Sequence, residues 1–475
     1  MAADPIKHVV VLMLENQSFD RMVGLIPGVD GVDVAHLRSN PDSLTSAAIL
    51  QNSSTQARMD FDPPHDYDDV IAQIEGTGVP CSGFVNAFLK HHSTGKPDEI
   101  MAFYDSGTLP AIENLAQQFV ICDRWFSSVP GPTWPNRFFV NSGTSLGHID
   151  MPDLVHFDPA IHLYDQPTVF ERLSEAGKVW RIYFEDFSQT TLMTRQALFA
   201  VNYRYMLSFE DDCQDAAGFP QYTFIEPKFF WPGQNDQHPT SDIRRGDTLI
   251  ARVYNALRKN EDLWNSTLFI VLYDEHGGFY DHVDPRDPAY KAKAVPPDAH
   301  VTPENFAFDL FGLRVPALLI SPWLDPAILT GVYDHTSLLR YLTDKWGLGA
   351  LGNRTPVANN FADELVWRDT VRTDTPETIT TVPVPEDPKP TNLSEHQEAL
   401  VSYSRYLELQ MANKTVPGPE RNDFLVQVGS RLLRTVGDLT HHGDVAAERL
   451  RLYLNSHGAN LTPPAPPPLP PPLQP

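Results

Sequence analysis

The chain has 475 residues, of which 41% are hydrophobic and 20% are charged, so it can bury a large core or carry a second module. Its formal net charge of −25 argues against a general nucleic-acid-binding protein, and an anionic substrate would need a local cation. No apolar run approaches the ~18 residues that a membrane span requires. The three widely spaced cysteines favour free buried thiols over a disulfide framework or a thiolate metal site.

The N-terminal segment lacks the pattern of a signal peptide. From the sequence as written we therefore expect a cytoplasmic protein, with a secreted or periplasmic protein as the alternative if a signal has been removed. Self-association and transient contact with a membrane surface are both compatible with this composition.

An apolar run at residues 8–14 predicts the first buried strand, because it is rich in strand-forming residues. The run ends at Glu15–Asn16, which would place a carboxylate and an amide at the carboxyl end of that strand. Ser18 is positioned to cap a helix that follows. Residues 25–64 have many turn-forming residues and no periodicity, so we expect a long loop that leads to His65.

The middle of the chain alternates between helical and strand-like patterns, which is typical of an α/β fold. Helical spacing extends over residues 66–88, with a Gly-Pro break near residues 78–80. Three prolines within residues 129–137 predict a rigid turn around Thr133. Further helices are predicted at residues 109–116, 168–176, 247–259 and 333–346, and further strands at residues 119–122, 179–183 and 315–320.

Residues 267–282 contain the most informative pattern in the chain. The apolar run from Leu268 to Tyr273 predicts a central strand that is covered on both faces of the sheet. Asp274–Glu275 follow directly, and two glycines after His276 allow a sharp turn or a close approach to a ligand. Because ligands bind at the carboxyl edge of parallel sheets, we expect this edge to meet the one that carries Glu15–Asn16.

The composition changes after about residue 360, where Thr, Val, Pro and Asp dominate. We predict a main domain over residues 1–360, a strap or linker over 361–393, a helical C-terminal region over 394–462 and a Pro-rich, disordered tail over 463–475. Helical stretches are expected at residues 394–413, 420–436 and 446–456. None of them carries a cluster of ligand-type residues, so this region is expected to pack on the core, mediate self-association or shape an entrance.

Oxygen donors dominate the polar residues at the two strand ends and in the Pro-rich turn. Together they would suit a divalent cation that is bound through oxygen, and they are Glu15, Asn16, Thr133, Asp274 and Glu275. Such an ion would lower the pKa of the Thr133 hydroxyl, which makes this side chain the candidate nucleophile. Nearby histidines would donate a proton to a leaving alcohol. Each pattern taken alone also fits a plainer role, such as a polar turn or a surface histidine.

Several motifs in the same order resemble one known family of phosphoesterases. They are Glu15-Asn16-Gln17-Ser18-Phe19-Asp20, Gly131 to Arg137, Asp236 to Pro239, Tyr273 to Val283, and Arg314-Val315-Pro316 through Ser337. The family includes bacterial phosphatidylcholine-type phospholipases C, plant non-specific phospholipases C and a branch of acid phosphatases. The resemblance covers roughly residues 6–347. Its relation to the alkaline phosphatase superfamily implies an α/β/α sandwich with a metal and a nucleophile at the strand ends, followed here by the helical C-terminal region.

The resemblance also implies roles for individual residues. One divalent ion is expected, with zinc, calcium, magnesium and manganese all left open. Its ligands would be Glu15, Asn16, Asp274 and Glu275, with Thr133 as the metal-bound nucleophile. The residues around the phosphate would be Asn136, His65 and His238. Two further histidines would contact substrate, support the ligands or cap helices, and they are His282 and His335.

Two departures from the family pattern bear on the substrate. Gln17 stands where the family commonly has Arg, and the residues after Val283 are less typical, which leaves the substrate contacts open. A threonine at position 133 resembles the phospholipase branch, whereas the acid phosphatase branch tends to use serine.

The leading hypothesis is a metal-dependent phosphoric ester hydrolase that cleaves phospholipids as a phospholipase C does, through a phosphothreonine intermediate. The second is an acid phosphatase-like phosphomonoesterase. From another class comes a non-catalytic phosphate- or lipid-binding protein, which would not need a nucleophile together with a full set of ligands. The expected partner is therefore a phospholipid or a small phosphate ester, and no nucleic acid is expected.

Overall fold

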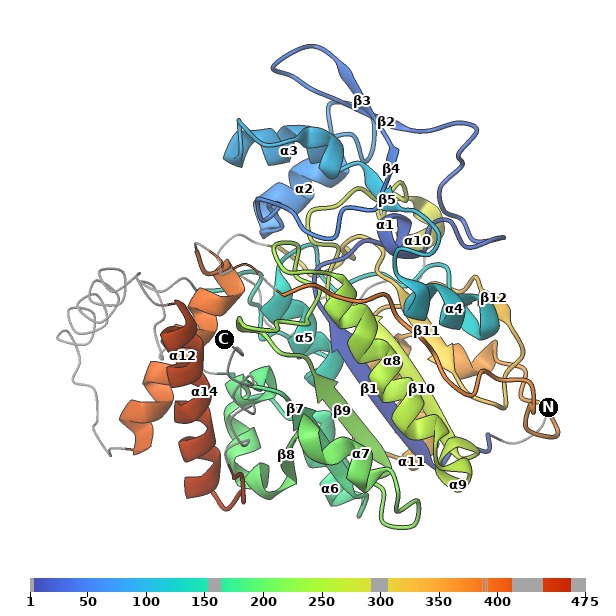
Figure 1. Ribbon diagram of the computed structural model, residues 1–475, viewed down its shortest axis with the longest axis vertical. Helices are drawn as coiled ribbons and strands as arrows, with labels where there is room; N and C mark the ends of the chain where they lie inside the picture. Colours follow the sequence, from blue (N-terminus) through green and yellow to red (C-terminus); the bar gives the residue numbers. More distant parts are fainter. Residues whose placement is uncertain are drawn as a thin grey trace, which may run out of the picture.

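The computed structural model describes residues 4–152, 164–291, 306–386, 388, 390, 392–411 and 439–462. These residues form a mixed sheet of eight strands with helices on both sides, so the expected α/β fold is confirmed (Figure 1). The strands in spatial order are β12 (Ala327–Leu329), β6 (Val120–Cys122), β11 (Ala317–Ile320), β10 (Thr267–Tyr273), β1 (His8–Leu14), β9 (Tyr222–Glu226), β7 (Trp180–Phe184) and β8 (Tyr203–Tyr205).

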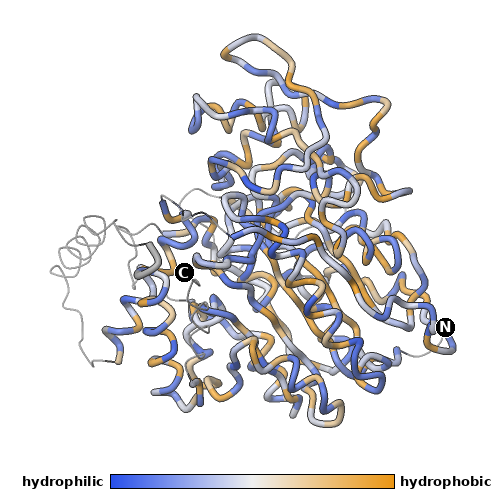
Figure 2. The backbone as a smooth tube through the Cα atoms, in the orientation of Figure 1, coloured by the Kyte–Doolittle hydropathy of each residue, from blue (hydrophilic) through white to orange (hydrophobic). Residues whose placement is uncertain are grey.

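The centre of the sheet is the parallel pair β1 and β10. Every residue of both strands is buried, which is the burial expected for a strand covered on both faces. Figure 2 shows the hydrophobic colouring that runs through this part of the backbone. The two strands pair without offset from His8 opposite Thr267 to Leu14 opposite Tyr273. As a result, Glu15 and Asp274 leave the sheet side by side.

Most of the sheet runs in the direction of β1. Strands β9 and β7 are parallel to their neighbours, and β11 is antiparallel to both β10 and β6. The carboxyl ends of β1, β9 and β10 therefore lie at one edge of the sheet. This is the edge at which ligands bind in α/β proteins.

Helices cover the sheet on both sides. Helix α8 crosses the front of the sheet in Figure 1, where α4, α7 and α9 pack with it, and α11 lies behind the sheet, where α5 packs with it. The helices up to α11 are α1 (Phe19–Val23), α2 (Tyr67–Glu75), α3 (Phe84–His91), α4 (Pro110–Gln118), α5 (Thr133–Ser142), α6 (Val169–Glu175), α7 (Phe209–Asp212), α8 (Arg244–Arg258), α9 (Glu261–Trp264), α10 (Pro288–Lys291) and α11 (His335–Trp346). In the described residues, no helix is long and apolar enough to span a bilayer.

A small lobe lies beyond the carboxyl edge of β1 (Figure 1). Helices α2 and α3 belong to it, and they confirm the predicted helical region with its break. The predicted loop before His65 is mostly irregular, and the short strands of the lobe are β2 (Ser39–Pro41), β3 (Ala48–Leu50), β4 (Asn52–Ser54) and β5 (Ala102–Tyr104). The lobe has an apolar core of its own, in which Phe84 and Phe88 share a cluster with Phe279 from the segment after β10. The lobe is thereby attached to the edge where the candidate site lies.

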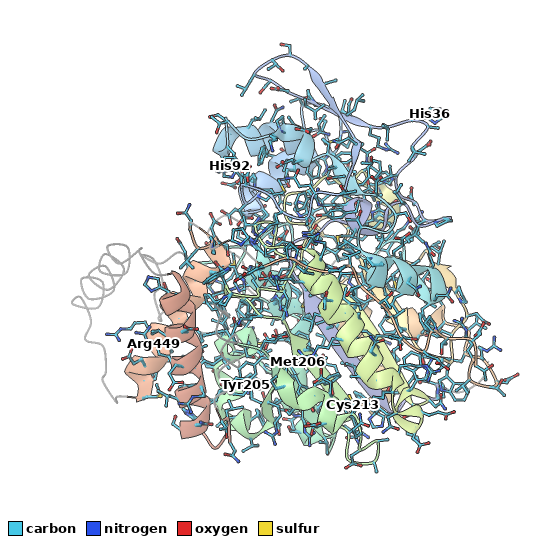
Figure 3. All side chains as sticks on the ribbon, viewed as in Figure 1. His36, His92, Tyr205, Met206, Cys213 and Arg449 are labelled. Atoms are coloured by element: carbon cyan, nitrogen blue, oxygen red, sulfur yellow. The ribbon has the colours of Figure 1, made fainter. Side chains whose placement is uncertain are left out.

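The C-terminal region contributes α12 (Glu395–Met411) and α14 (Leu439–Ser456), which pack together. Helix α12 confirms the first predicted stretch, and α14 begins earlier than the predicted start at residue 446. An ion pair of 2.8 Å joins Arg449 of α14, labelled in Figure 3, to Glu408 of α12. The predicted stretch 420–436 and the Pro-rich tail 463–475 lie outside the described residues. The proposed domain boundaries stay predictions.

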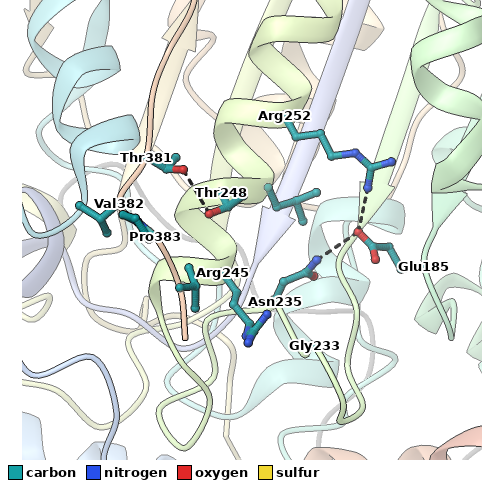
Figure 4. Close-up of a pocket in the computed structure, with 11 residues that line it drawn as sticks. Glu185, Gly233, Asn235, Arg245, Thr248, Arg252, Thr381, Val382 and Pro383 are labelled. Carbon is teal, nitrogen blue, oxygen red and sulfur yellow. Dashed lines mark hydrogen bonds and ion pairs between the residues drawn. The ribbon is translucent and has the colours of Figure 1, made fainter. Parts of the chain in front are cut away.

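The strap that connects the main domain with α12 runs along α8. Its backbone binds side chains of that helix, because Tyr254 donates to the carbonyl of Pro376 at 2.6 Å and Asn255 to that of Ile379 at 2.9 Å. A cavity of about 430 Å³ lies between the strap and α8, and Figure 4 shows Thr248 and Thr381 facing each other across it. The described part of the strap therefore follows a defined path along α8.

Gly277, in the turn after β10, gives a direct test of how tightly this edge is packed. Its φ is +67°, and a Cβ atom there would lie 2.1 Å from the carbonyl oxygen of Asn16. Gly177 has nearly the same φ, +65°, but a Cβ atom there would meet nothing within 4 Å. Gly177→Ala should therefore lower the free energy of unfolding by only about 1 kcal/mol, which is the cost of the left-handed conformation for a residue with a side chain. Gly277→Ala should lower the free energy of unfolding, measured with a denaturant, by about 2 kcal/mol more, because the backbone at Asn16 must move. Equal losses in the two variants would show that the turn can relax.

Candidate active site

The ends of β1 and β10 are joined by hydrogen bonds at the carboxyl edge. The carboxylate of Asp274 accepts the backbone N–H of Asn16 at 3.1 Å and that of Glu275 at 2.8 Å through the same oxygen. The backbone N–H of Gln17 donates to the carbonyl of Glu275 at 3.0 Å. Glu15, Asn16, Asp274 and Glu275 are all fully buried. The structure thus brings together the two strand ends that the sequence predicted to converge.

Asn16 lies at the centre of the site. Its φ of +57° is uncommon for a residue with a side chain, although Asn tolerates it better than most. Its side-chain nitrogen lies 3.4 Å from Nε2 of His65, and its side-chain oxygen accepts from Oγ1 of Thr133 at 3.4 Å. The side chain of Asn16 therefore lies between the predicted nucleophile and a histidine that was predicted to contact phosphate.

Thr133 is the first residue of helix α5, which corrects the predicted rigid turn over residues 129–137. The turn ends at Pro132, and helix begins there because Pro135 lies in the first turn, where its missing N–H is not needed. No side chain caps this helix. The N–H groups of a first turn carry partial positive charge, so the hydroxyl of Thr133 lies where an anion is favoured.

Asn136 holds the turn that precedes α5. Its side-chain oxygen accepts the N–H of Val129 at 3.0 Å, and its side-chain nitrogen donates to the carbonyls of Val129, Gly131 and Pro132 at 3.0–3.3 Å. This side chain therefore fixes the backbone that leads to Thr133. Its predicted contact with phosphate stays a prediction.

Arg137 is a site residue that the sequence analysis did not single out. Its Nε lies 2.9 Å from a carboxylate oxygen of Asp274, and its Nη2 lies 3.3 Å from one of Glu15. The side chain is only 3% exposed. The sequence did contain a signal for this role, which is the spacing of Arg137 from Thr133. Two side chains that are four residues apart lie on the same face of a helix. The guanidinium bridges the two strand ends.

The charges of this group are uneven, because three buried carboxylates face one guanidinium. Burial raises the pKa of Asp274 to about 7. Arg137 acts to lower this pKa, and the neighbouring carboxylates of Glu15 and Glu275 offset part of that effect. Burial also disfavours ionisation of Glu15, but its contacts with His396 and Arg137 bring its pKa down to about 2. Arg137 alone therefore does not balance the three carboxylates.

The donor set fits a divalent cation of the oxygen-binding kind. One carboxylate oxygen of Glu275 is buried without a hydrogen-bond partner among the described residues, and the hydroxyl of Thr133 and the amide oxygen of Asn16 lie beside each other. Both carboxylate oxygens of Glu15 already accept hydrogen bonds, although each oxygen has a second lone pair. The predicted ligand roles of Glu15, Asn16, Thr133, Asp274 and Glu275 are compatible with this arrangement and stay predictions.

His65 and His238 lie together next to this group, with ring centroids 6.2 Å apart. Nδ1 of His65 donates to the carbonyl of Pro63 at 2.6 Å, and Nε2 of His238 lies 3.2 Å from the carboxylate of Asp62. Burial acts to lower both pKa values, but Glu275 and Asp62 raise that of His65 to about 10, and Asp62 raises that of His238 to about 9. Both rings are therefore cationic near neutral pH, as binding of a phosphate requires. The sequence analysis missed Asp62, which stands three residues before His65.

His335 supports the site from behind. Its Nε2 donates to the carbonyl of Asp274 at 2.7 Å, and its Nδ1 accepts from the indole of Trp125 at 3.3 Å. Burial lowers its pKa to about 4, so the ring is neutral and holds the backbone at the end of β10. Of the alternatives for His335, a supporting role is the one that this geometry favours over contact with substrate.

His282 belongs to a separate polar cluster. It lies 2.8 Å from the carboxylate of Asp20 and 3.1 Å from that of Asp30, and buried Arg314 binds Asp20 and Asp281 in the same cluster. Among the described residues it makes no contact with Thr133, His65 or His238. Direct contact of His282 with substrate is therefore not supported by the geometry.

Gln17, which departs from the family pattern, is buried beside the site. Its side-chain nitrogen donates to the carbonyl of Gln237 at 2.8 Å. Gln17 thus ties the segment after β1 to the loop that carries His238.

Comparisons with known proteins identify the family. The model of the Phosphoesterase family matches residues 6–349. Non-specific phospholipase C3 of Arabidopsis thaliana is 35% identical over 421 residues, which cover 81% of this chain and 78% of that protein. Phospholipase C B of Mycobacterium tuberculosis is 27% identical over 435 residues, covering 81% of this chain and 80% of that protein.

Among solved structures, a protein in the alkaline phosphatase superfamily from Vibrio parahaemolyticus aligns with a TM-score of 0.33 and 14% identity, over 54% of this chain and 66% of that chain. The family match spans β1, α5, β10 and α11, the elements that build the site. The chain therefore belongs to the Phosphoesterase family and is a phosphoric ester hydrolase.

Proposed function

We propose that the protein is a phospholipase C, which cleaves a phospholipid between the glycerol oxygen and phosphorus through a covalent intermediate on Thr133. The observation that carries this proposal is the position of the Thr133 hydroxyl. It lies at the start of a ten-residue helix, 3.4 Å from Asn16 and next to a site with two cationic histidines. The names of the similar proteins, which are phospholipases C, support a lipid substrate.

The first step places the phosphate between the nucleophile and the histidines. His65 and His238 donate hydrogen bonds to phosphoryl oxygens, and the N–H groups at the start of α5 face the charge that develops on them. Thr133 reacts as its alkoxide, after its hydroxyl proton has been released to water. Oγ1 attacks phosphorus, and the bond from phosphorus to the diacylglycerol oxygen breaks. A histidine gives its proton to that oxygen, so that diacylglycerol leaves as an alcohol.

The second step returns the enzyme to its starting state. The phosphoryl group, with its head group, is now bonded to Oγ1 of Thr133. Water attacks phosphorus, the bond to Oγ1 breaks, and the deprotonated histidine takes a proton from the water. A phosphorylated head group results, and Thr133 leaves as the alkoxide that began the cycle.

A divalent cation held by Glu15, Asn16, Thr133, Asp274 and Glu275 would lower the pKa of the hydroxyl and offset phosphoryl charge when bound. The neighbouring side chains prepare this chemistry. Arg137 fixes the carboxylates of Glu15 and Asp274, and Asn16 holds the hydroxyl of Thr133 in place. One oxygen of Glu275 accepts no hydrogen bond among the described residues and lies 4.0 Å from Nε2 of His65, which leaves a lone pair for a cation.

The competing hypotheses differ in what they require of the site. A phosphomonoesterase needs the same nucleophile but no room for a diacylglycerol leaving group. A non-catalytic binder needs the cationic histidines but neither a hydroxyl at the start of α5 nor a surplus of carboxylates. The geometry therefore argues against the binder, and the two enzymes are separated by their substrates.

A comparison of substrates tests the proposal directly. A short-chain phosphatidylcholine should release diacylglycerol and phosphocholine, with a kcat/KM at least about tenfold above that for an aryl phosphate monoester. Diacylglycerol is measured by mass spectrometry, and Thr133→Ala protein prepared in the same way controls for contaminating lipases. Faster turnover of the monoester without release of diacylglycerol would favour the phosphatase.

Replacement of the nucleophile separates covalent attack from attack by water. Thr133→Ala should lower kcat on the order of a thousandfold, because it removes the attacking oxygen, whereas Thr133→Ser keeps a hydroxyl and should retain measurable activity. Rapid quenching of the wild-type reaction with labelled substrate should trap label on the peptide that contains Thr133. An active Thr133→Ala enzyme, together with no trapped label, would mean that water attacks directly.

The cation can be tested without an activity assay. Glu275→Gln removes the charge of a carboxylate that has one oxygen without a hydrogen bond among the described residues, so the purified variant should bind far less divalent metal than the wild type by elemental analysis and calorimetry. Glu226→Gln is the matched control, because Glu226 is equally buried at the end of neighbouring β9 but accepts hydrogen bonds from Gln189 and Thr190. It should retain the metal. Equal metal content in all three proteins, or full activity after chelation, would contradict the proposed site.

A further inference from the structure

The first turn of α12 reaches the candidate active site from outside the family match. That match ends at residue 349, and α12 begins at Glu395. Nevertheless, His396 is only 1% exposed, and its Nδ1 lies 3.1 Å from a carboxylate oxygen of Glu15. A helix in which the sequence analysis found no cluster of ligand-type residues thus contacts a proposed metal ligand.

Gln189 completes a set of three side chains around Glu15. Its side-chain nitrogen lies 3.0 Å from the other carboxylate oxygen of Glu15 and 2.5 Å from Nε2 of His396. A carboxylate only accepts hydrogen bonds, so both Gln189 and Nδ1 of His396 donate to it. The second hydrogen of the Gln189 amide is then directed at Nε2 of His396, which accepts it. Each partner defines the orientation of the other two.

The same turn of α12 is anchored by Gln397, which does not touch Glu15. Its side-chain nitrogen donates to the carbonyl of Phe229 at 2.6 Å and to the side chain of Gln234 at 3.2 Å. The ring of Phe229 packs edge-on against His396 at a centroid distance of 5.0 Å. Anchoring of the helix and contact with Glu15 are therefore carried by two adjacent residues, which can be changed separately.

We propose that His396 is a positioning residue of the active site, which together with Gln189 holds the carboxylate of Glu15 in the orientation that the cation and Arg137 require. The active site would then extend beyond the residues of the family match and be complete only when α12 is docked. This inference rests on the proposed function, in which Glu15 helps to hold a cation. Glu15 needs such support, because Arg137 contacts only one of its two carboxylate oxygens.

The chemistry of hydrogen-bond donors sets the choice of variants. His396→Ala removes the donor to Glu15, whereas His396→Asn places an amide nitrogen near the position of Nδ1 and can donate again. Gln397→Ala weakens the same turn of α12 and leaves the contact with Glu15 intact. A purely structural role of the turn would make His396→Ala and Gln397→Ala similar in every measurement.

The test measures the affinity for a divalent cation such as Mn²⁺ by calorimetry, together with kcat, KM and melting temperature. His396→Ala should bind the cation about 10–100-fold more weakly and show a lower kcat with little change in KM. His396→Asn should recover most of both losses, and Gln397→Ala should keep its cation affinity within about twofold of the wild type.

Two outcomes would overturn the inference. One is an unchanged cation affinity in His396→Ala, and the other is the same loss in Gln397→Ala, which would show that only the docking of α12 matters. A failure of the proposed function would look different. In that case wild-type protein would release no diacylglycerol, while the difference in cation affinity between His396→Ala and the wild type would remain.

Discussion

The in-register parallel pairing of β1 and β10 is the constraint on which the rest of the site depends. Leu14 pairs with Tyr273, so the next residue of each strand is a carboxylate at the same height of the sheet. A shift of one residue would turn the side chains of one strand to the opposite face. Because both strands are apolar and buried on both faces, their pairing is backed by the whole core, and it fixes the distance between Glu15 and Asp274 before any ligand is present.

Such close carboxylates repel one another, and the structure compensates with Arg137. A buried guanidinium between two carboxylates gains little net stability, since all three charges lose their hydration. Removal of Arg137 would nevertheless leave the carboxylates uncompensated. Its position one helical turn after Thr133 means that the charge balance at the strand ends and the orientation of the nucleophile depend on the same helix.

Backbone strain accompanies this arrangement. Asn16 and Gln237 both have positive φ, +57° and +73°, and both are fully buried. Each is matched by a nearby glycine, because a Cβ atom at Gly277 would collide with Asn16 and one at Gly246 with Gln237. Strained residues of this kind persist only where the surrounding packing holds them. Here they direct the amide of Asn16 towards Thr133 and place the loop of His238 beside β1.

The sequence by itself determined the local features of this protein. The apolar runs defined β1 and β10, the helical spacing defined α2, α3 and α11, and the residues at the strand ends indicated oxygen-ligand chemistry with Thr133 as nucleophile. The predictions of strands and helices are confirmed, because burial and periodicity act over a few neighbouring residues, whereas the ligand and nucleophile roles stay predictions. The tertiary structure alone decided the contacts made over long distances along the chain. It placed Arg137 between two carboxylates, assigned Asn136 and His335 to support of the backbone and His282 to a separate cluster, and brought His396 to Glu15 across 381 residues of sequence. No local pattern encodes such contacts, because they arise only when the sheet has closed and α12 has docked on it.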